Sequence, residues 1–459
     1  MKRSKSFILL VVIATVVCSI TAVTAIQVVK KGSIDWNRLY KSPGFVQKAK
    51  RIESKKVVAA HIEKPCVFKT VFGEQASDSG FVFKTSEKVQ ESINRALTWI
   101  SKAQNQDGGW AAGQRFNESY EDNNKNATSA KSDPATTSMV GMALLRCGSS
   151  PIKGQYTAQS QKALDFLLNA VEKSSENADN ITTIEGTQPQ VKLGGNIDVI
   201  LTSQYLTNLS DEITNVGLKN RINLAINKCI RKIQKATQSD GSIKNGGWAS
   251  VLQSSLADNA METAYKNGAQ VDTVIMNKSK NFHKGNVSAA NENVATEKAA
   301  GVVLYAVSST SRSSAKEAKL AKEAIEDALK SGKTKSKAIT TENLKKSGMS
   351  DAQAMKYASA YSINQTSQAI AQRDEVITGF GNNGGEEFLS YVQTVEAMVM
   401  SKNLGWKKWY DNIGGRLLNI QEKNGSWTGH HCITSPVFCT ATCLLFLSVN
   451  NDVEELINL

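Results

Sequence analysis

The sequence predicts an all-helical repeat protein. Apolar residues recur at helical spacing through most of the chain from Thr85 onward. Only six prolines occur in 459 residues, so few positions interrupt long helices. A turn with Asp or Asn followed by Gly recurs after three of the predicted helices. Hairpins of this kind cannot bury their apolar faces alone, so we expect them to stack on one another.

The first 25 residues form the clearest local signal. A basic start at residues 1–5 is followed by an apolar run from Phe7 to about Ile26. Val23-Thr24-Ala25 has the small-residue pattern of a signal-peptidase site, and the run is also nearly long enough to span a bilayer uncut. We therefore expect residues 1–25 to be a signal peptide or a membrane anchor. The rest of the chain would then be exported, either periplasmic or membrane-anchored outside the cytoplasm.

Residues 26–84 are predicted to be a stalk or linker, because they show Lys-rich stretches and little sustained periodicity. The first hairpin follows. A periodic helix through Val89, Ile93 and Ile100 ends near Ala103 and leads into the turn at residues 104–110. After a polar loop, Asp133-Pro134 predicts the start of a second helix, with Asp as the cap and Pro at the first helical position.

The same order recurs twice more. An apolar-periodic segment at residues 222–233 precedes a turn at Gln238–Ser242, and Gly246-Gly247-Trp248 follows shortly after. A segment at residues 413–420 precedes Gln421–Trp427, and an apolar helix at 438–445 comes next. Two looser copies are found where residues 163–167 pair with 200–206, and where Gly384-Gly385 precedes a helix through Met398.

The residues of the turn have physical roles. Gly permits the positive φ of a tight reversal, Trp packs its ring on the end of the preceding helix, and Gln bonds exposed backbone groups there. The positions expected to be structural in this way are Gln104, Asp107, Gly108, Trp110, Asp240, Gly241, Trp248, Gln421, Asn424, Gly425 and Trp427.

These turns resemble the QW repeats of the squalene cyclases, in the terpenoid cyclase and prenyltransferase/squalene-oxidase repeat superfamily. The resemblance covers residues 85–450 and implies an α/α toroid, an α6/α6 barrel of about five to six helical hairpins. An Ala- and Lys-rich segment at 315–349 is expected to be a helical insertion. The strings Asp133–Thr137 and Gly429–Thr434 are most similar to those of exported bacterial proteins that carry the repeat, a branch whose resemblance implies no particular activity.

The net charge of +13 favours anionic neighbours, but much of it lies in two Lys-rich tracts, Lys48–Lys64 and Lys316–Lys346. In the second tract acidic residues alternate with the lysines, as on a solvated helix face. No pattern of basic and aromatic residues accompanies the charge, so we expect no nucleic-acid partner.

The sequence lacks the motifs for the chemistries that the resemblance implies. The Asp-x-Asp-Asp acid motif that the resemblance implies for a cyclase is absent, as is an Asp-Asp-x-x-Asp diphosphate motif. Aromatic residues make up only 7% of the chain, which is thin for stabilising carbocations. Cys439 stands about where a prenyltransferase carries a zinc ligand, but no upstream Asp-x-Cys partner is found. We expect no cofactor, with zinc as the alternative.

The C-terminal segment concentrates reactive side chains, since two of the four histidines lie there beside three cysteines. His430, His431 and Cys432 are the expected binding residues, in a loop packed over the barrel mouth. The alternatives are a Cys432–Cys439 disulfide, a metal site at Cys432, Cys439 and Cys443, and a Cys–His nucleophile pair.

Four carboxylates are the candidates for catalysis: Glu386, Glu387, Asp133 and Asp198. Each lies at a predicted helix start, so the competing interpretation is that they cap helices and interact with the helix dipole. The favoured function is an exported, non-catalytic toroid that binds an apolar ligand, or a protein or envelope partner, at one barrel mouth. The alternative is a diverged enzyme of the cyclase or prenyltransferase type that acts on an apolar substrate.

Overall fold

The computed structural model describes residues 81–113, 130–379 and 383–458, all within one compact unit, Pro65–Leu459. The expectations for residues 1–25 and for nearly all of 26–84 lie outside the described residues. Within the described ranges the fold is all-α, without any named strand. The helices, in chain order, are α3 (Glu87–Lys102), α4 (Pro134–Arg146), α5 (Thr157–Lys173), α6 (Gln188–Lys192), α7 (Ile197–Ser210), α8 (Val216–Ala236), α9 (Ser250–Lys266), α10 (Thr273–Lys284), η1 (Glu297–Ala299), α11 (Val303–Lys330), α12 (Thr341–Ser347), α13 (Asp351–Ala371), α14 (Asp374–Ile377), α15 (Gly385–Met400), α16 (Trp406–Ile420), α17 (Pro436–Leu447), η2 (Val449–Asp452) and α18 (Val453–Ile457).

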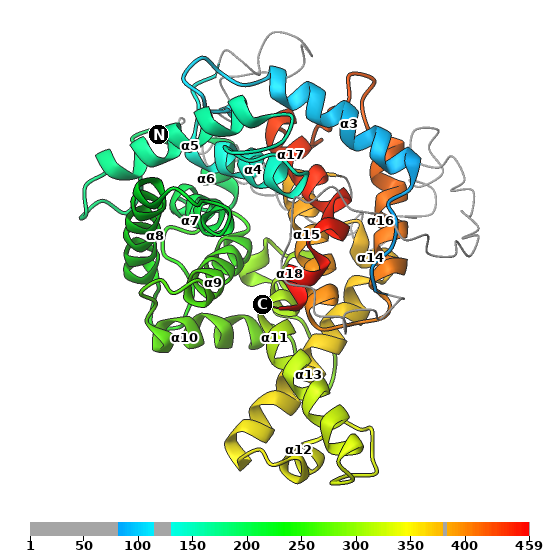
Figure 1. The fold of residues 1–459 in the computed structure, drawn as a ribbon. Coiled ribbons are helices and arrows are strands. Elements are labelled where there is room, and N and C mark those ends of the chain that lie inside the picture. Colours follow the sequence, from blue (N-terminus) through cyan, green and yellow to red (C-terminus); the bar gives the residue numbers. More distant parts are fainter. Residues whose placement is uncertain (1–80, 114–129, 380–382, 459) are drawn as a thin grey trace, which may run out of the picture. The chain divides into compact units, whose positions relative to one another are not determined.

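Six of these helices form a closed inner ring. In the order α4, α7, α9, α11, α15 and α17 each packs against the next, and α17 returns to α4 (Figure 1). Helices α3, α5, α8, α10, α13 and α16 pack on the outside of this ring. The predicted α/α toroid of about five to six helical hairpins is therefore confirmed, with six hairpins in the described residues.

The distribution of apolar residues explains which helices are inside. All twelve residues of α17 are buried, because neighbours surround an inner helix on every side. The outer helix α3 is amphipathic instead. It buries one stripe that includes Val89, Ile93, Leu97 and Ile100, and turns its charged residues to solvent.

Each repeated turn follows one outer helix and packs against a neighbouring outer helix. Gly108, Gly241 and Gly425 have φ of +90°, +93° and +99°. A Cβ at these glycines would lie 2.7, 2.3 and 2.7 Å from backbone oxygens of α5, α10 and α3, so a side chain is excluded there. The last turn thus packs on the first outer helix, which closes the outer ring.

The Trp and Gln side chains of the first and last turns act as predicted. Trp110 and Trp427 are fully buried, and each indole N–H donates to a carbonyl of the preceding outer helix, Ile100 or Leu417, at 2.8 Å. The amide of Gln421 donates to Ser92 O of α3 at 3.0 Å. In the same way the amide of Gln104 donates to Gln159 O of α5 at 2.9 Å.

The middle copy corrects the sequence interpretation. Trp248 is 52% exposed, so the prediction that it packs as a repeat Trp is wrong. The buried Ile243 takes that place, because its N–H donates to Ser254 Oγ as the N–H of Trp427 donates to Thr440 Oγ1. Trp248 comes five residues later and lies over Lys192, whose Nζ is 4.2 Å from the ring centroid.

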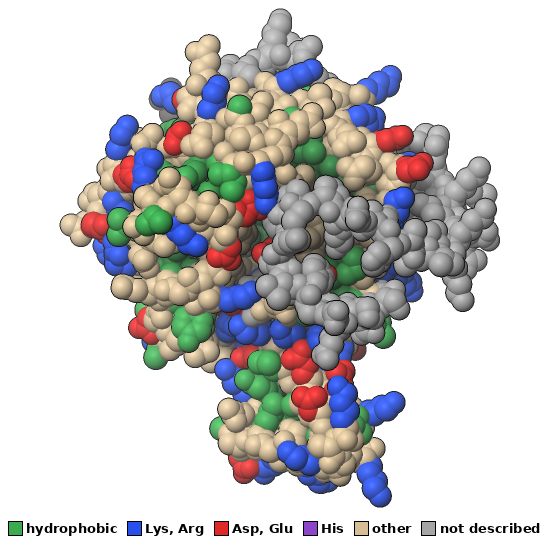
Figure 2. Space-filling view, in the orientation of Figure 1, with side chains coloured by type: hydrophobic (Ala, Val, Ile, Leu, Met, Phe, Trp, Pro, Cys, Tyr) green, Lys and Arg blue, Asp and Glu red, His purple; other side chains and the backbone are tan. Residues whose placement is uncertain are grey.

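A projection extends from the ring where the second half of α11, α12 and the first half of α13 leave it (Figure 1). The expected insertion at residues 315–349 contains the end of α11 and α12. The projection has a small core of its own, formed by Ala321, Ile325, Leu344 and Ala354. Its surface carries basic and acidic side chains side by side (Figure 2), with an ion pair such as Lys346–Glu342 at 2.8 Å.

In the described part of the chain, no single helix has both the length and the apolarity to cross a membrane. The bent pair of α17 with residues 449–457 passes by length and composition, but α17 is entirely buried in the ring.

Candidate functional site

The two ends of the inner ring differ in their side chains. Because an outer helix lies between successive inner helices, all six inner helices run in the same direction. Their first residues gather at one end of the ring, here called the N-terminal end, and their last residues at the C-terminal end. All four predicted catalytic carboxylates lie at the N-terminal end.

Asp133 and Asp198 form a buried pair there. Asp133 accepts hydrogen bonds from the backbone N–H groups of Thr136 (2.7 Å) and Ala112 (2.9 Å). Asp198 accepts from Ala135 N–H (3.1 Å), the first turn of the neighbouring inner helix. Burial and the nearby Asp198 raise the pKa of Asp133 to about 7, and burial raises the pKa of Asp198 as well. Their bonds to backbone groups make both residues helix-end anchors.

Glu386 and Glu387 are also buried and also anchor backbone. Glu386 accepts from Ile433 N–H at 3.1 Å, and burial followed by the charge of Glu387 raises its pKa to about 7. Glu387 accepts from Gly384 N–H at 2.9 Å and from the Tyr305 hydroxyl. These bonds fix the start of α15 and the loop before α17.

The predicted binding loop packs over these carboxylates. His431 Nε2 lies 3.8 Å from a Glu387 carboxylate oxygen, whereas the His430 side chain is exposed. Cys432 is half-buried with φ of +60°, an uncommon conformation for a residue with a side chain. Burial and the charge of Glu386 raise the pKa of its thiol to about 11, while the Lys192 ammonium acts in the opposite direction.

Lys192 was not among the predicted site residues. It is fully buried beside Cys432, and its ammonium group has no oxygen or nitrogen hydrogen-bond partner among the described residues. No motif marks it, because it ends the short helix α6 in an unremarkable stretch. The same helix supplies Gln188, whose side-chain oxygen accepts from Thr434 N–H (2.8 Å), and Gln190, which donates to Asp198 (2.7 Å). Helix α6 therefore links the two carboxylate pairs.

The cysteines of this region are free thiols. Cys439 and Cys443 are buried on α17, and the Cys439 thiol donates to Ile433 O at 3.4 Å. Burial raises the pKa of both thiols well above its usual range. The alternative of a Cys432–Cys439 disulfide is therefore wrong for this structure, and no group of three or more His, Cys, Asp or Glu residues within the described ranges is placed to hold a metal ion.

A cavity lies at the opposite, C-terminal end. It offers about 140 Å³ to the centres of water-sized spheres, where one water needs roughly 10–15 Å³ by the same measure. All six inner helices contribute to its wall. The apolar part of the lining consists of Met139, Met142, Leu145, Leu256, Leu389, Val392, Leu445 and Leu456, and the uncharged polar part consists of Gln204, Asn208, Asn259, Thr263, Asn267 and Gln393.

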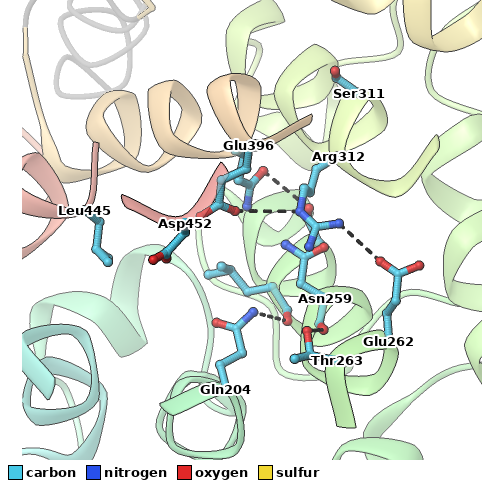
Figure 3. A network of polar contacts seen from close by, with 12 residues as sticks. Gln204, Asn259, Glu262, Thr263, Ser311, Arg312, Glu396, Leu445 and Asp452 are labelled. Atoms are coloured by element: carbon cyan, nitrogen blue, oxygen red, sulfur yellow. Dashed lines mark hydrogen bonds and ion pairs between the residues drawn. The ribbon is translucent and has the colours of Figure 1, made fainter. Parts of the chain in front are cut away.

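Four of the charged side chains that line the cavity, those of Arg146, Arg312, Glu396 and Asp452, belong to one network of ion pairs (Figure 3). Arg312 contacts Glu262 at 3.2 Å and Glu396 at 3.7 Å. Arg146 contacts Glu396 at 2.8 Å and also pairs with Asp452. Lys280 pairs with Glu262, whose pKa is held at about 2 by its two cationic partners despite burial. The network thus joins three cations to three carboxylates.

None of the residues predicted from sequence for catalysis, binding or metal ligation lines this cavity. Its lining residues are scattered over the six inner helices and the C-terminal segment, and they do not form a short sequence motif. The sequence feature that could have indicated the cavity is the presence of amide and charged residues within otherwise apolar inner helices. Examples are Asn259 in α9 and Gln393 in α15.

Comparison with known proteins gives three findings. Residues 69–191 match the family described as the squalene-hopene cyclase C-terminal domain. No curated protein matches the chain. Among solved structures, the chain is similar to a substrate-complexed variant of the type II terpene cyclase MstE from Scytonema, with 11% sequence identity and a TM-score of 0.42. This alignment covers 80% of this chain and 98% of that one.

The family match lies over the first predicted repeat, and the described structure contains the turns and the ring of hairpins that the repeat implies. Over residues 69–191 the chain is therefore similar to the squalene-hopene cyclase C-terminal domain.

Proposed function

We propose that this protein binds a small ligand with an apolar part in the cavity at the C-terminal end of its inner ring. The observation that carries the proposal is the composition of the cavity wall, to which all six inner helices contribute. It combines an apolar band with uncharged polar groups from α7, α9 and α15 and with seven charged side chains, four of which pair with one another. Binding sites for small molecules are usually concave, mainly apolar and supplied with a few polar groups that orient the ligand.

The enzyme alternative has less support. All four candidate carboxylates lie at the N-terminal end, hydrogen-bonded to backbone N–H groups, and none lines the cavity. Among the described residues that line the cavity none is aromatic, whereas a cyclase of this superfamily would be expected to stabilise cations with aromatic faces. The proposal is therefore binding without chemistry.

The test uses the neutral dye N-phenyl-1-naphthylamine, which fluoresces strongly in apolar surroundings, with the purified full-length protein. We expect saturable binding of one dye per chain and at least a tenfold loss of affinity in Met142→Trp, which fills the cavity. The matched control is Met355→Trp, because Met355 is 63% exposed on the projection. Equal dye binding by the three proteins, or no saturable binding by any, would refute the proposal. Circular dichroism checks that each variant is folded.

We also propose that the toroid lies outside the cytoplasm. The support is the basic start and the apolar run of residues 1–25. A reporter enzyme that is active only outside the cytoplasm, fused after Leu459, should be active. Activity that persists after deletion of residues 1–25, or no activity of the intact fusion, would contradict this localisation.

A further inference from the structure

Two amide side chains in the cavity wall have hydrogen-bonding groups that find no partner in the part of the chain that the structure describes. Gln393 on α15 accepts through its oxygen from Ser255 Oγ (3.3 Å) and Ser309 Oγ (3.5 Å), but its NH₂ group has no acceptor. Asn259 on α9 has a side-chain oxygen without a donor. Both side chains are at least 95% buried.

Buried polar groups are nearly always hydrogen-bonded, so unpaired groups beside a cavity indicate where a ligand or ordered water binds. One unused donor on α15 and one unused acceptor on α9, two inner helices with α11 between them in the ring, match a ligand group that can both accept and donate. A hydroxyl group does this, and so does a primary or secondary amide. The terminal torsion of an amide side chain is broad, so either group can turn toward a ligand at small cost.

The charges near these amides do not call for a charged ligand. Arg312 and Arg146 are engaged by Glu262, Glu396 and Asp452, so the ion-pair network is neutral as a whole. Arg312 Nε has no hydrogen bond, but it lies 3.7 Å from a Glu396 carboxylate oxygen, so an added anion would have to lose its hydration shell and compete with Glu396 for this group. The other charged lining residues are Lys266, Asp211 and Glu455, two acids and one base at the ends of α9 and α7 and on α18.

We infer that the cavity selects an uncharged amphiphile whose hydroxyl or amide group bonds Gln393 and Asn259, with its apolar part against the band around Met139, Met142 and Leu256. This inference rests on the proposed function, because it names the class of ligand for the same cavity.

The experiment compares three probes with one ten-carbon chain and different head groups: 1-decanol, decanoate and decylammonium. Each competes with N-phenyl-1-naphthylamine on the full-length protein, below its aggregation concentration. We expect 1-decanol to bind about tenfold more tightly than either charged probe, the change that one net hydrogen bond produces. Gln393→Leu and Asn259→Leu should each remove most of this preference without lowering dye affinity. The matched control is Gln161→Leu, a Gln on the outer helix α5 whose amide donates to Asp165 at 3.3 Å.

Tighter binding of decanoate or decylammonium than of 1-decanol would overturn the inference and leave the proposed function standing. The same holds if both Leu variants keep the full preference for the alcohol. Failure of the dye itself to bind would remove both. A further check is Gln393→Glu, which should shift the preference toward decylammonium if this side chain contacts the head group.

Discussion

The two ends of the inner ring use similar polar residues in opposite ways. At the N-terminal end, buried carboxylates accept hydrogen bonds from backbone N–H groups and hold helix starts and loops in place. At the C-terminal end, charged side chains pair with each other across a cavity, and two amide groups are left unpaired. Polar residues in a helical ring therefore indicate function only where the backbone has not already engaged them.

The repeat turns, like the buried carboxylates of the N-terminal end, have a structural role. We expect substitutions in these turns to cause the largest loss of stability. Trp427→Ala removes a fully buried indole and its bond to Leu417 O, and should lower the free energy of unfolding by about 3–5 kcal/mol. Urea denaturation followed by circular dichroism measures the change. A loss below about 1 kcal/mol would show that the turn does not hold the last outer helix against the ring.

The ion-pair network at the C-terminal end should rank next. Arg146→Met leaves the Glu396 and Asp452 carboxylates without their main cation, and breaking such a buried pair costs about 3 kcal/mol. The double variant Arg146→Met/Asp452→Asn should recover part of that loss in the same denaturation assay. If the double variant is as unstable as the sum of the two single variants, the charges do not act as one network.

The pH dependence of stability tests the buried carboxylates. The pKa of Asp133 is raised to about 7, so between pH 4 and pH 7 the native state binds more protons than the unfolded state. Stability should therefore fall as pH rises from about 4 toward 7 and level off above 7, with a loss on the order of 2 kcal/mol for this group between pH 5 and pH 8. Glu386 and Asp258, with pKa values also raised to about 7, act in the same direction.

Asp133→Asn should make this dependence less steep in denaturation curves recorded from pH 5 to pH 8, while Glu386 and Asp258 maintain the rest of it. Asp165→Asn is the matched control, since Asp165 is exposed on the outer helix α5 and should leave the dependence unchanged. A variant at position 133 with the wild-type pH profile would mean that this carboxyl does not titrate in the range.

The smallest effect is expected at Trp248. Because its ring is half-exposed and lies over the Lys192 ammonium, Trp248→Ala should cost about 1 kcal/mol, the range of exposed cation–π contacts. Denaturation beside Trp427→Ala makes the contrast direct. A cost comparable to that of Trp427→Ala would restore Trp248 as a packing residue of the repeat.

Particular residues show how far sequence reasoning reached. The turns at Asp107-Gly108 and Asn424-Gly425 could be predicted, because a tight reversal needs a positive φ and leaves few residue choices. In the middle copy, the distance along the chain from the turn determines which residue takes the place of the repeat Trp. That residue is Ile243 and not Trp248. The carboxylates at 133, 198, 386 and 387 were correctly expected at helix starts, yet only their partners distinguish an anchor from a catalytic acid.

The sequence by itself determined the helical periodicity, the reversals and the capping residues, because each depends on contacts within a few residues along the chain. The tertiary structure alone decided that the ring closes from α17 to α4, that Lys192 lies under the loop at Cys432, and that a cavity is left at the C-terminal end. These features join positions up to about three hundred residues apart, and no local preference records which side chains remain unpaired when distant helices meet.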